Sequence, residues 1–186
     1  PIVDVGKCID CGLCEKVCPY INEKEPNEPL ISYGAINLQN EIRKESSSGG
    51  VFTAIASKII SDGGVVFGAQ YDENWQVVHQ LAETVNDCRS FRGAKYVQSR
   101  IGNSYKQVES FLRDGRRVLF SGTPCQISGL KNFLDKDYNN LLLVDVVCHG
   151  VPSPKIWKEY LQSLNLHQIS SISHKDKSTG WRSYSF

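Results

Sequence analysis

The architecture follows from two apolar runs and the turn after the first: Arg117-Val-Leu-Phe120, Ser121-Gly-Thr-Pro-Cys125 and Leu141-Leu-Leu-Val-Asp-Val-Val147. Both runs predict strands, and the longer one is typical of a central parallel strand. Between them, apolar residues recur at helical spacing, namely Ile127, Leu130, Phe133 and Leu134. Strand, helix and strand in this order predict a parallel pair joined by a crossover helix.

A cysteine follows each of these strands. Parallel strands joined by a helix end at the same edge of a sheet, so the turns 122–125 and 148–150 are expected at one edge. There, Cys125 and Cys148 could bind a metal cluster, form a redox dithiol, line a cofactor pocket or simply pack. Each lies in a glycine-containing turn, which favours metal ligation, and further ligands would come from outside this chain. A cysteine protease built on the adjacent Cys148 and His149 is rejected, because catalytic partners are usually distant in sequence.

Further strands and helices surround this pair. Strands are predicted at 65–69 and 76–81, with additional short strands at 1–5, 31–38, 168–173 and 181–186. Helices are predicted to begin at residues 51, 84, 103 and 154. The fold class is therefore α/β (α+β overall), a mixed, partly parallel sheet with flanking helices.

Ser46-Ser-Ser48-Gly49-Gly50 opens the first of these helices. Serines and glycines at a helix start leave free N–H groups and little bulk, which suits a phosphate. An ordinary serine N-cap explains the same residues. His79, within a predicted strand, has no evident partner in the sequence, and Cys88 in its predicted helix is interpreted as a small packing residue.

The N-terminal stretch has a more specific pattern, Cys8-Ile-Asp-Cys11-Gly-Leu-Cys14-Glu-Lys-Val-Cys18-Pro19. This spacing is that of bacterial ferredoxins, in which such cysteines bind [4Fe–4S] clusters and the fourth cysteine serves a second cluster. Gly12 permits the tight turn that brings backbone N–H groups to the sulfurs. A zinc site prefers separated cysteine pairs, and a disulfide framework implies a small secreted chain, so both are less suited to this sequence.

Composition restricts the remaining possibilities. The chain has 186 residues and a formal net charge of +1, which gives no electrostatic case for nucleic acid or an anionic membrane. No apolar run approaches the roughly 20 residues that span a bilayer. Seven cysteines with this spacing suit the cytoplasm. The chain has no methionine, which predicts a fragment of a longer protein. We predict a partial ferredoxin-type domain at 1–22, a linker at 23–45 and an α/β domain at 46–186.

Four motifs behind the cysteine stretch form a recognisable set: Ser46–Gly50, Lys95-Tyr-Val-Gln-Ser99, Gly122-Thr-Pro-Cys-Gln126 and Cys148-His-Gly-Val-Pro-Ser153. In this order they resemble the family of coenzyme F-420 hydrogenase/dehydrogenase beta subunits. The resemblance covers nearly the whole chain. It implies an oxidoreductase, an iron–sulfur flavoprotein that passes electrons between [4Fe–4S] clusters and FAD. It also implies a deazaflavin, ferredoxin or similar redox partner, and a place as a subunit of a larger complex.

The resemblance also implies roles for individual residues. Cys8, Cys11, Cys14, Cys18, Cys125 and Cys148 are the expected cluster ligands. The expected flavin site is lined by Ser47, Ser48, Gly49, Gly50, Lys95, Gly122, Thr123, Pro124, Gln126, His149 and Gly150. Partner ligands of Cys125 and Cys148 are expected beyond Phe186, and the first half of the ferredoxin module before Pro1. A non-enzymatic electron-transfer adaptor is the alternative function.

Overall fold

The computed structural model describes residues 3–22, 31–166, 168–180 and 183. A four-stranded sheet forms its centre, in the order β2-β1-β3-β4. The strands are β1 (Val65–Tyr71), β2 (Val77–Ala82), β3 (Val118–Gly122) and β4 (Leu141–Asp145). β1, β3 and β4 are parallel to one another, and β2 pairs antiparallel with β1. This mixed, mostly parallel sheet confirms the predicted fold class.

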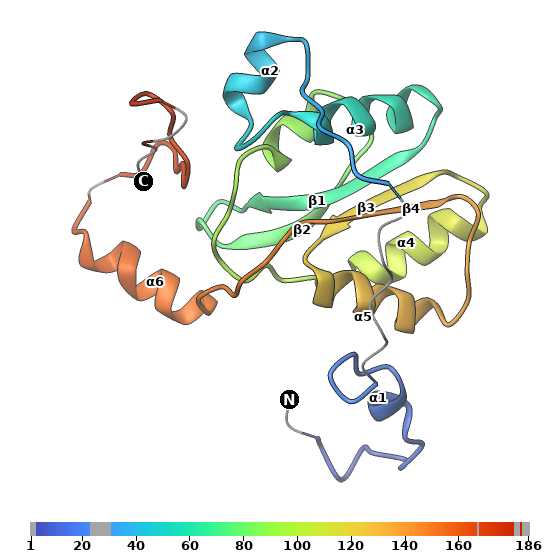
Figure 1. The fold of residues 1–186 in the computed structure, drawn as a ribbon. Coiled ribbons are helices and arrows are strands. Elements are labelled where there is room, and N and C mark those ends of the chain that lie inside the picture. The colour runs from blue at the N-terminus through green and yellow to red at the C-terminus, as the bar shows by residue number, and fades with distance from the viewer. Residues whose placement is uncertain (1–2, 23–30, 167, 181–182, 184–186) are drawn as a thin grey trace.

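Helices cover both faces of the sheet (Figure 1). One face carries α3 (Val51–Ser61) and the 3₁₀ helix η1 (Asp87–Phe91); the other carries α4 (Ser104–Arg113) and α5 (Pro124–Leu134). Side chains alternate between the faces as strand geometry requires. Phe67 and Phe120 therefore pack toward α4 and α5, whereas Val66 and Leu119 pack toward α3 and η1.

In the described part of the chain, three further helices lie outside these two layers. They are α1 (Leu13–Lys16), α2 (Asn40–Glu45) and α6 (Pro154–Ser163). Helix α2 occupies residues 40–45 of the predicted linker. None of the helices in the described residues is long and apolar enough to cross a membrane.

The sequence misplaced one strand and predicted others that do not form. The run 141–147 was expected to be a central strand, but β4 stops at Asp145 and lies at the edge of the described sheet. Leu142 is 41% exposed and Val147 is 89% exposed, so an apolar run alone did not fix the position of the strand.

Residues 31–38 and 168–173 contain no strand. The first of these segments is attached through the Asn37 N–H, which donates to Gly49 O at 2.7 Å, rather than through a strand ladder. Nor do residues 3–5 form a strand. The rest of the predicted strand 1–5, and all of 181–186 except Ser183, lie outside the described residues.

Candidate functional site

The N-terminal cysteines lie on a short exposed loop around α1. Cys8, Cys11 and Cys14 are exposed, Cys18 is half-buried, and all four are free thiols. Asp10 and Gly12 both have positive φ, of 53° and 67°, and so turn the chain tightly between the cysteines. The Asp10 N–H donates to Cys8 Sγ at 3.4 Å, the kind of bond that surrounds cluster sulfurs.

These features fit an iron–sulfur cluster in donor chemistry and backbone path. Among the described residues, no three His, Cys, Asp or Glu side chains are grouped closely enough to hold a metal ion. The assignment of all four cysteines therefore stays a prediction.

Two polar contacts attach this loop to the C-terminal end of α5. Lys16 pairs with Asp135 at 2.8 Å, and Asn132 Nδ2 donates to Val17 O at 3.2 Å. Cys125 lies at the opposite end of this 11-residue helix, which is about 16 Å long at 1.5 Å per residue. The structure thus holds the N-terminal cysteine loop and the Cys125 turn at different ends of one helix (Figure 1).

The carboxyl ends of β3 and β4 form the second region, which we call the sheet edge. Gly122 pairs with Asp145 across the two strands, and the Val146 N–H donates to Gly122 O at 2.9 Å. The turn carrying Cys125 and the loop carrying Cys148 therefore leave neighbouring strands at the same edge, as the topology predicted. That the two sulfurs share one cluster stays a prediction.

The Cys148 loop has local features of its own. The Gly150 N–H donates to Cys148 Sγ at 3.4 Å, as the Asp10 N–H does to Cys8. Gly150 has a φ of 124°, and His149 is exposed. Ser153 then caps α6, accepting from the Ile156 N–H at 3.4 Å, as the sequence predicted. Exposed His149 is therefore available to a ligand at this edge.

The serine–glycine turn, residues 46–50, lies where α3 begins. Gly50, with a φ of 76°, is the N-cap, and no side chain caps the helix. The serine N-cap interpretation is therefore wrong. Ser46 Oγ donates to Ile42 O at 2.6 Å, and Ser47 Oγ accepts from the Ala94 N–H. The serines shape the turn and leave the helix start without a side-chain cap.

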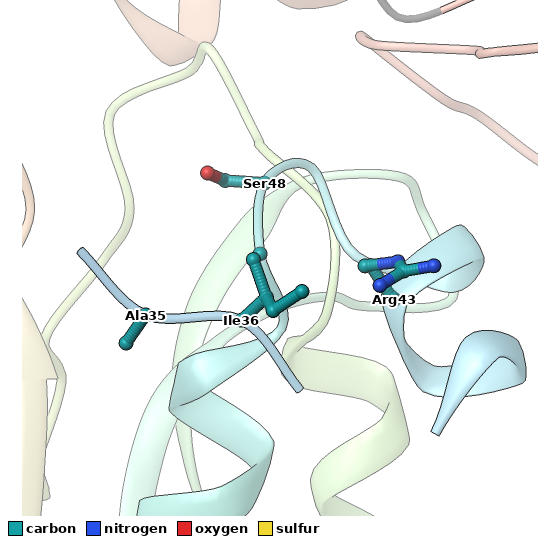
Figure 2. A pocket seen from close by; sticks show the side chains of 5 residues that line it. Ala35, Ile36, Arg43 and Ser48 are labelled. Carbon is teal, nitrogen blue, oxygen red and sulfur yellow. The ribbon is translucent and has the colours of Figure 1, made fainter. Parts of the chain in front are cut away.

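A hollow of about 440 Å³ lies against this turn. It is lined by Ala35, Ile36, Arg43, Ser48 and Gly49, and Figure 2 shows Arg43 and Ser48 around it together with the segment that carries Ala35 and Ile36. A Cβ on Gly49 would lie 2.8 Å from Ala35 O, so this backbone approach requires glycine. The Arg43 guanidinium donates to Asn40 Oδ1 at 2.6 Å, and Arg43 brings positive charge to the hollow, which suits an anion. Sequence reasoning missed Arg43, although it stands three residues before the serines.

Lys95 lies close to the same turn, since its neighbour Ala94 bonds Ser47. Its ammonium donates to Arg92 O at 2.9 Å and to Gly93 O at 3.2 Å, and lies 5.9 Å from the centre of the Tyr71 ring. Burial lowers the pKa of Lys95 to about 8. The side chain stays mostly protonated at neutral pH, as an anion site needs.

An aromatic cluster beyond Lys95 was not anticipated. It consists of Tyr71, Trp75, Tyr96, Trp157 and His174. Tyr71 Oη and His174 Nε2 are 2.7 Å apart, and Trp157 Nε1 donates to Trp75 O at 2.7 Å. Burial, then the Lys95 charge, lowers the pKa of His174. The cluster ties α6 and the segment at 174 to the carboxyl end of β1, next to Lys95.

The β3–α5 turn is tightly built. The Thr123 N–H donates to Gln126 Oε1 at 3.0 Å, and Thr123 Oγ1 lies 3.1 Å from Cys125 Sγ. A Cβ on Gly122 would lie 3.0 Å from Gln126 Oε1.

Cys88 lies apart from this turn. It is fully buried against α3, and burial raises its pKa to about 11. Its interpretation as a packing residue is confirmed.

Comparison with known proteins concerns the chain as a whole. Two domains described for the beta subunit of coenzyme F420 hydrogenase/dehydrogenase match the chain, the N-terminal one over residues 32–104 and the C-terminal one over residues 115–184. The chain belongs to this family of beta subunits. Residues 1–20 match a 4Fe-4S binding domain. The resemblance stated from the motifs is confirmed, whereas the domain division at 1–22, 23–45 and 46–186 stays a prediction.

Two known proteins are similar to this chain. The F subunit of the F(420)H(2) dehydrogenase of Methanosarcina mazei is 24% identical over 171 residues, covering 87% of this chain and 48% of the relative. A chain in the structure of the F420-reducing [NiFe] hydrogenase complex from Methanosarcina barkeri is 21% identical, with a TM-score of 0.54. This similarity covers 75% of our chain and 50% of the hydrogenase chain. The second comparison shows a shared fold. The chain spans about half the length of these relatives.

Proposed function

We propose that this chain is an oxidoreductase subunit that passes electrons between [4Fe–4S] clusters and FAD. The observation that carries the proposal is the combination, in one chain of this family, of a ferredoxin-type cysteine loop and a sheet edge with two more cysteines. Cys8, Cys11 and Cys14 would hold one cluster, and Cys18 would serve a second. Cys125 and Cys148 would supply two ligands of a further cluster.

We propose that the flavin extends from the serine–glycine turn to the sheet edge. Its phosphates suit the hollow beside Ser48, Gly49 and Arg43, where the uncapped start of α3 lies. Lys95 adds positive charge near the same turn. The remaining predicted residues, Gly122, Thr123, Pro124, Gln126, His149 and Gly150, follow β3 and β4 at that edge. A bound flavin supplies exchange between one-electron carriers and two-electron hydride acceptors.

The protein's own residues would bind and orient these groups and tune their potentials. N–H donors to Cys8 and Cys148 sulfurs are of the kind that shifts cluster potentials. The names of the two relatives, one from an F(420)H(2) dehydrogenase and one from an F420-reducing hydrogenase complex, support a deazaflavin, ferredoxin or similar redox partner. A place in a larger cytoplasmic complex is part of the same proposal.

Anaerobic analysis of iron, acid-labile sulfide and flavin in the purified protein tests the proposal. All three together support it. Iron and sulfide without flavin would leave an electron-transfer adaptor, and zinc alone would contradict the cluster assignment.

The flavin position is tested separately. Arg43→Gln removes the charge beside the hollow and is expected to weaken FAD binding, measured by equilibrium dialysis. Lys44→Gln is the matched control, because the exposed Lys44 does not line the hollow. Equal effects of both changes would show that the phosphates do not sit there.

A further inference from the structure

His79 has a definite set of partners that its sequence context does not reveal. Its side chain is buried in β2, with the residue 5% exposed, and stacks on Phe120 at a centroid distance of 5.2 Å. Its Nε2 lies 3.0 Å from Ser121 O. Because a carbonyl only accepts, Nε2 must carry the proton. Burial lowers the pKa of His79, against an opposing effect of the Ser121 bond, so the neutral ring is favoured.

The other ring nitrogen then accepts. Ser99 Oγ lies 3.0 Å from His79 Nδ1, and Gln126 Nε2 donates to the same Ser99 oxygen at 2.8 Å. The Gln126 amide can face only one way, because its Oε1 accepts the Thr123 N–H at 3.0 Å. Every donor is thereby assigned: the Gln126 amide donates to Ser99, and the Ser99 hydroxyl donates to His79.

These bonds close a ring around the turn that carries Cys125. His79 holds the carbonyl of Ser121, Gln126 holds the amide of Thr123, and Ser99 links the two holders. The ring therefore fixes the backbone on both sides of Gly122. Thr123 Oγ1 lies 3.1 Å from Cys125 Sγ, so the fixed backbone at Thr123 also positions the Cys125 thiol.

We propose that His79 is a positioning residue for Cys125, acting through Ser99 and Gln126 on the Ser121–Thr123 backbone. The proposal rests on the proposed function only for the use of the thiol as a cluster ligand. A histidine that merely filled space would need no hydroxyl at position 99. Among the residues that the structure describes, only the Ser99 hydroxyl joins His79 to Gln126 in this ring.

Ser99→Ala is the direct test, because it removes that link with little change in volume. Hydrogen exchange followed by mass spectrometry on the purified protein should show faster exchange of the Thr123 amide, in a peptide spanning 121–126. The expected increase is about two- to tenfold, as for the loss of one hydrogen bond. Ser99→Thr keeps the hydroxyl and is expected to restore the slow exchange.

Ser104→Ala is the matched control. Its hydroxyl also bonds His79, but through the backbone oxygen at 3.3 Å and outside the ring. It should leave exchange at 121–126 unchanged. Unchanged exchange in Ser99→Ala, or equal increases in both variants, would overturn the proposal.

A second readout concerns the cluster. In a Cys11→Ser background, iron lost to a chelator reports the sheet edge, and Ser99→Ala should weaken its retention about tenfold. Faster exchange with unchanged retention of sheet-edge iron would overturn the role toward the cluster. Faster exchange in a protein without sheet-edge iron would support the ring and count against the ligand assignment in the proposed function. ¹⁵N spectra should show His79 as the neutral Nε2–H form, and the other tautomer would contradict the ring.

Discussion

The N-terminal cysteine loop and the sheet edge both carry thiols, but the two regions bring their thiols together in different ways. In the loop, four cysteines lie within one short segment, and two polar contacts join it to α5. At the sheet edge, Cys125 and Cys148 are distant in sequence and reach neighbouring positions because β3 and β4 are parallel. The first region depends on local spacing and turns, and the second depends on the core. Substitutions in the core should therefore affect the sheet edge, and substitutions in local turns should affect the cysteine loop.

Phe120→Ala should have the largest effect. Phe120 is fully buried and contacts the rings of Phe67, His79 and Tyr105. Removing such a side chain costs roughly 3–5 kcal/mol of unfolding free energy. Urea unfolding followed by tryptophan fluorescence measures it, and a loss below about 1 kcal/mol would contradict the packing described here.

Gly122→Ala should come next. The added Cβ would lie 3.0 Å from Gln126 Oε1, 3.2 Å from Gln126 Cβ and 3.3 Å from Phe120 Cε1. Overpacking of this kind costs typically about 1–3 kcal/mol. Gly34→Ala is the control, since a Cβ there meets no atom within 4 Å. Equal unfolding midpoints for the two variants would show that the β3–α5 turn can accept a methyl group at Gly122 without a steric clash.

Gly12→Ala should affect the cysteine loop alone. Gly12 has a φ of 67°, and a side chain in that conformation costs about 1–2 kcal/mol. We expect weaker iron retention at the loop and an unchanged urea midpoint for the α/β domain. Gly6→Ala is the control, because its Cβ would have only an ordinary contact of 3.5 Å with Asp4. A shifted domain midpoint would show that the two regions are coupled.

The smallest effect concerns pH. The pKa of His79 is lowered in the folded state, so the unfolded state binds the proton more readily. The contribution of His79 to stability is complete above its ordinary pKa of about 6.5 and is lost as pH falls below it, by at most about 1.4 kcal/mol per pH unit.

His174, whose pKa is also lowered, adds a loss in the same direction. His79→Gln should therefore reduce the dependence of the urea midpoint on pH between about 5 and 6.5. An unchanged slope would mean that His79 titrates normally.

The sequence predicted more of the loop than of the sheet edge. Cysteine spacing and Gly12 are local signals, and the β–α–β pattern placed the turns 122–125 and 148–150 at one edge. The sequence pattern could not place β4 at the sheet border, because an apolar run does not show which strands pair with it. Nor could it find Arg43, His174 or the partners of His79, since these contacts join segments that only the folded chain brings together.

Iron and acid-labile sulfide per chain, measured in the anaerobically purified full-length protein, test the central claim most directly. Cys11→Ser and Cys125→Ser should each remove part of the iron and leave the rest, because the two regions lie at opposite ends of α5. Loss of all the iron from either single change, or no loss from Cys125→Ser, would contradict separate cluster binding in these two regions.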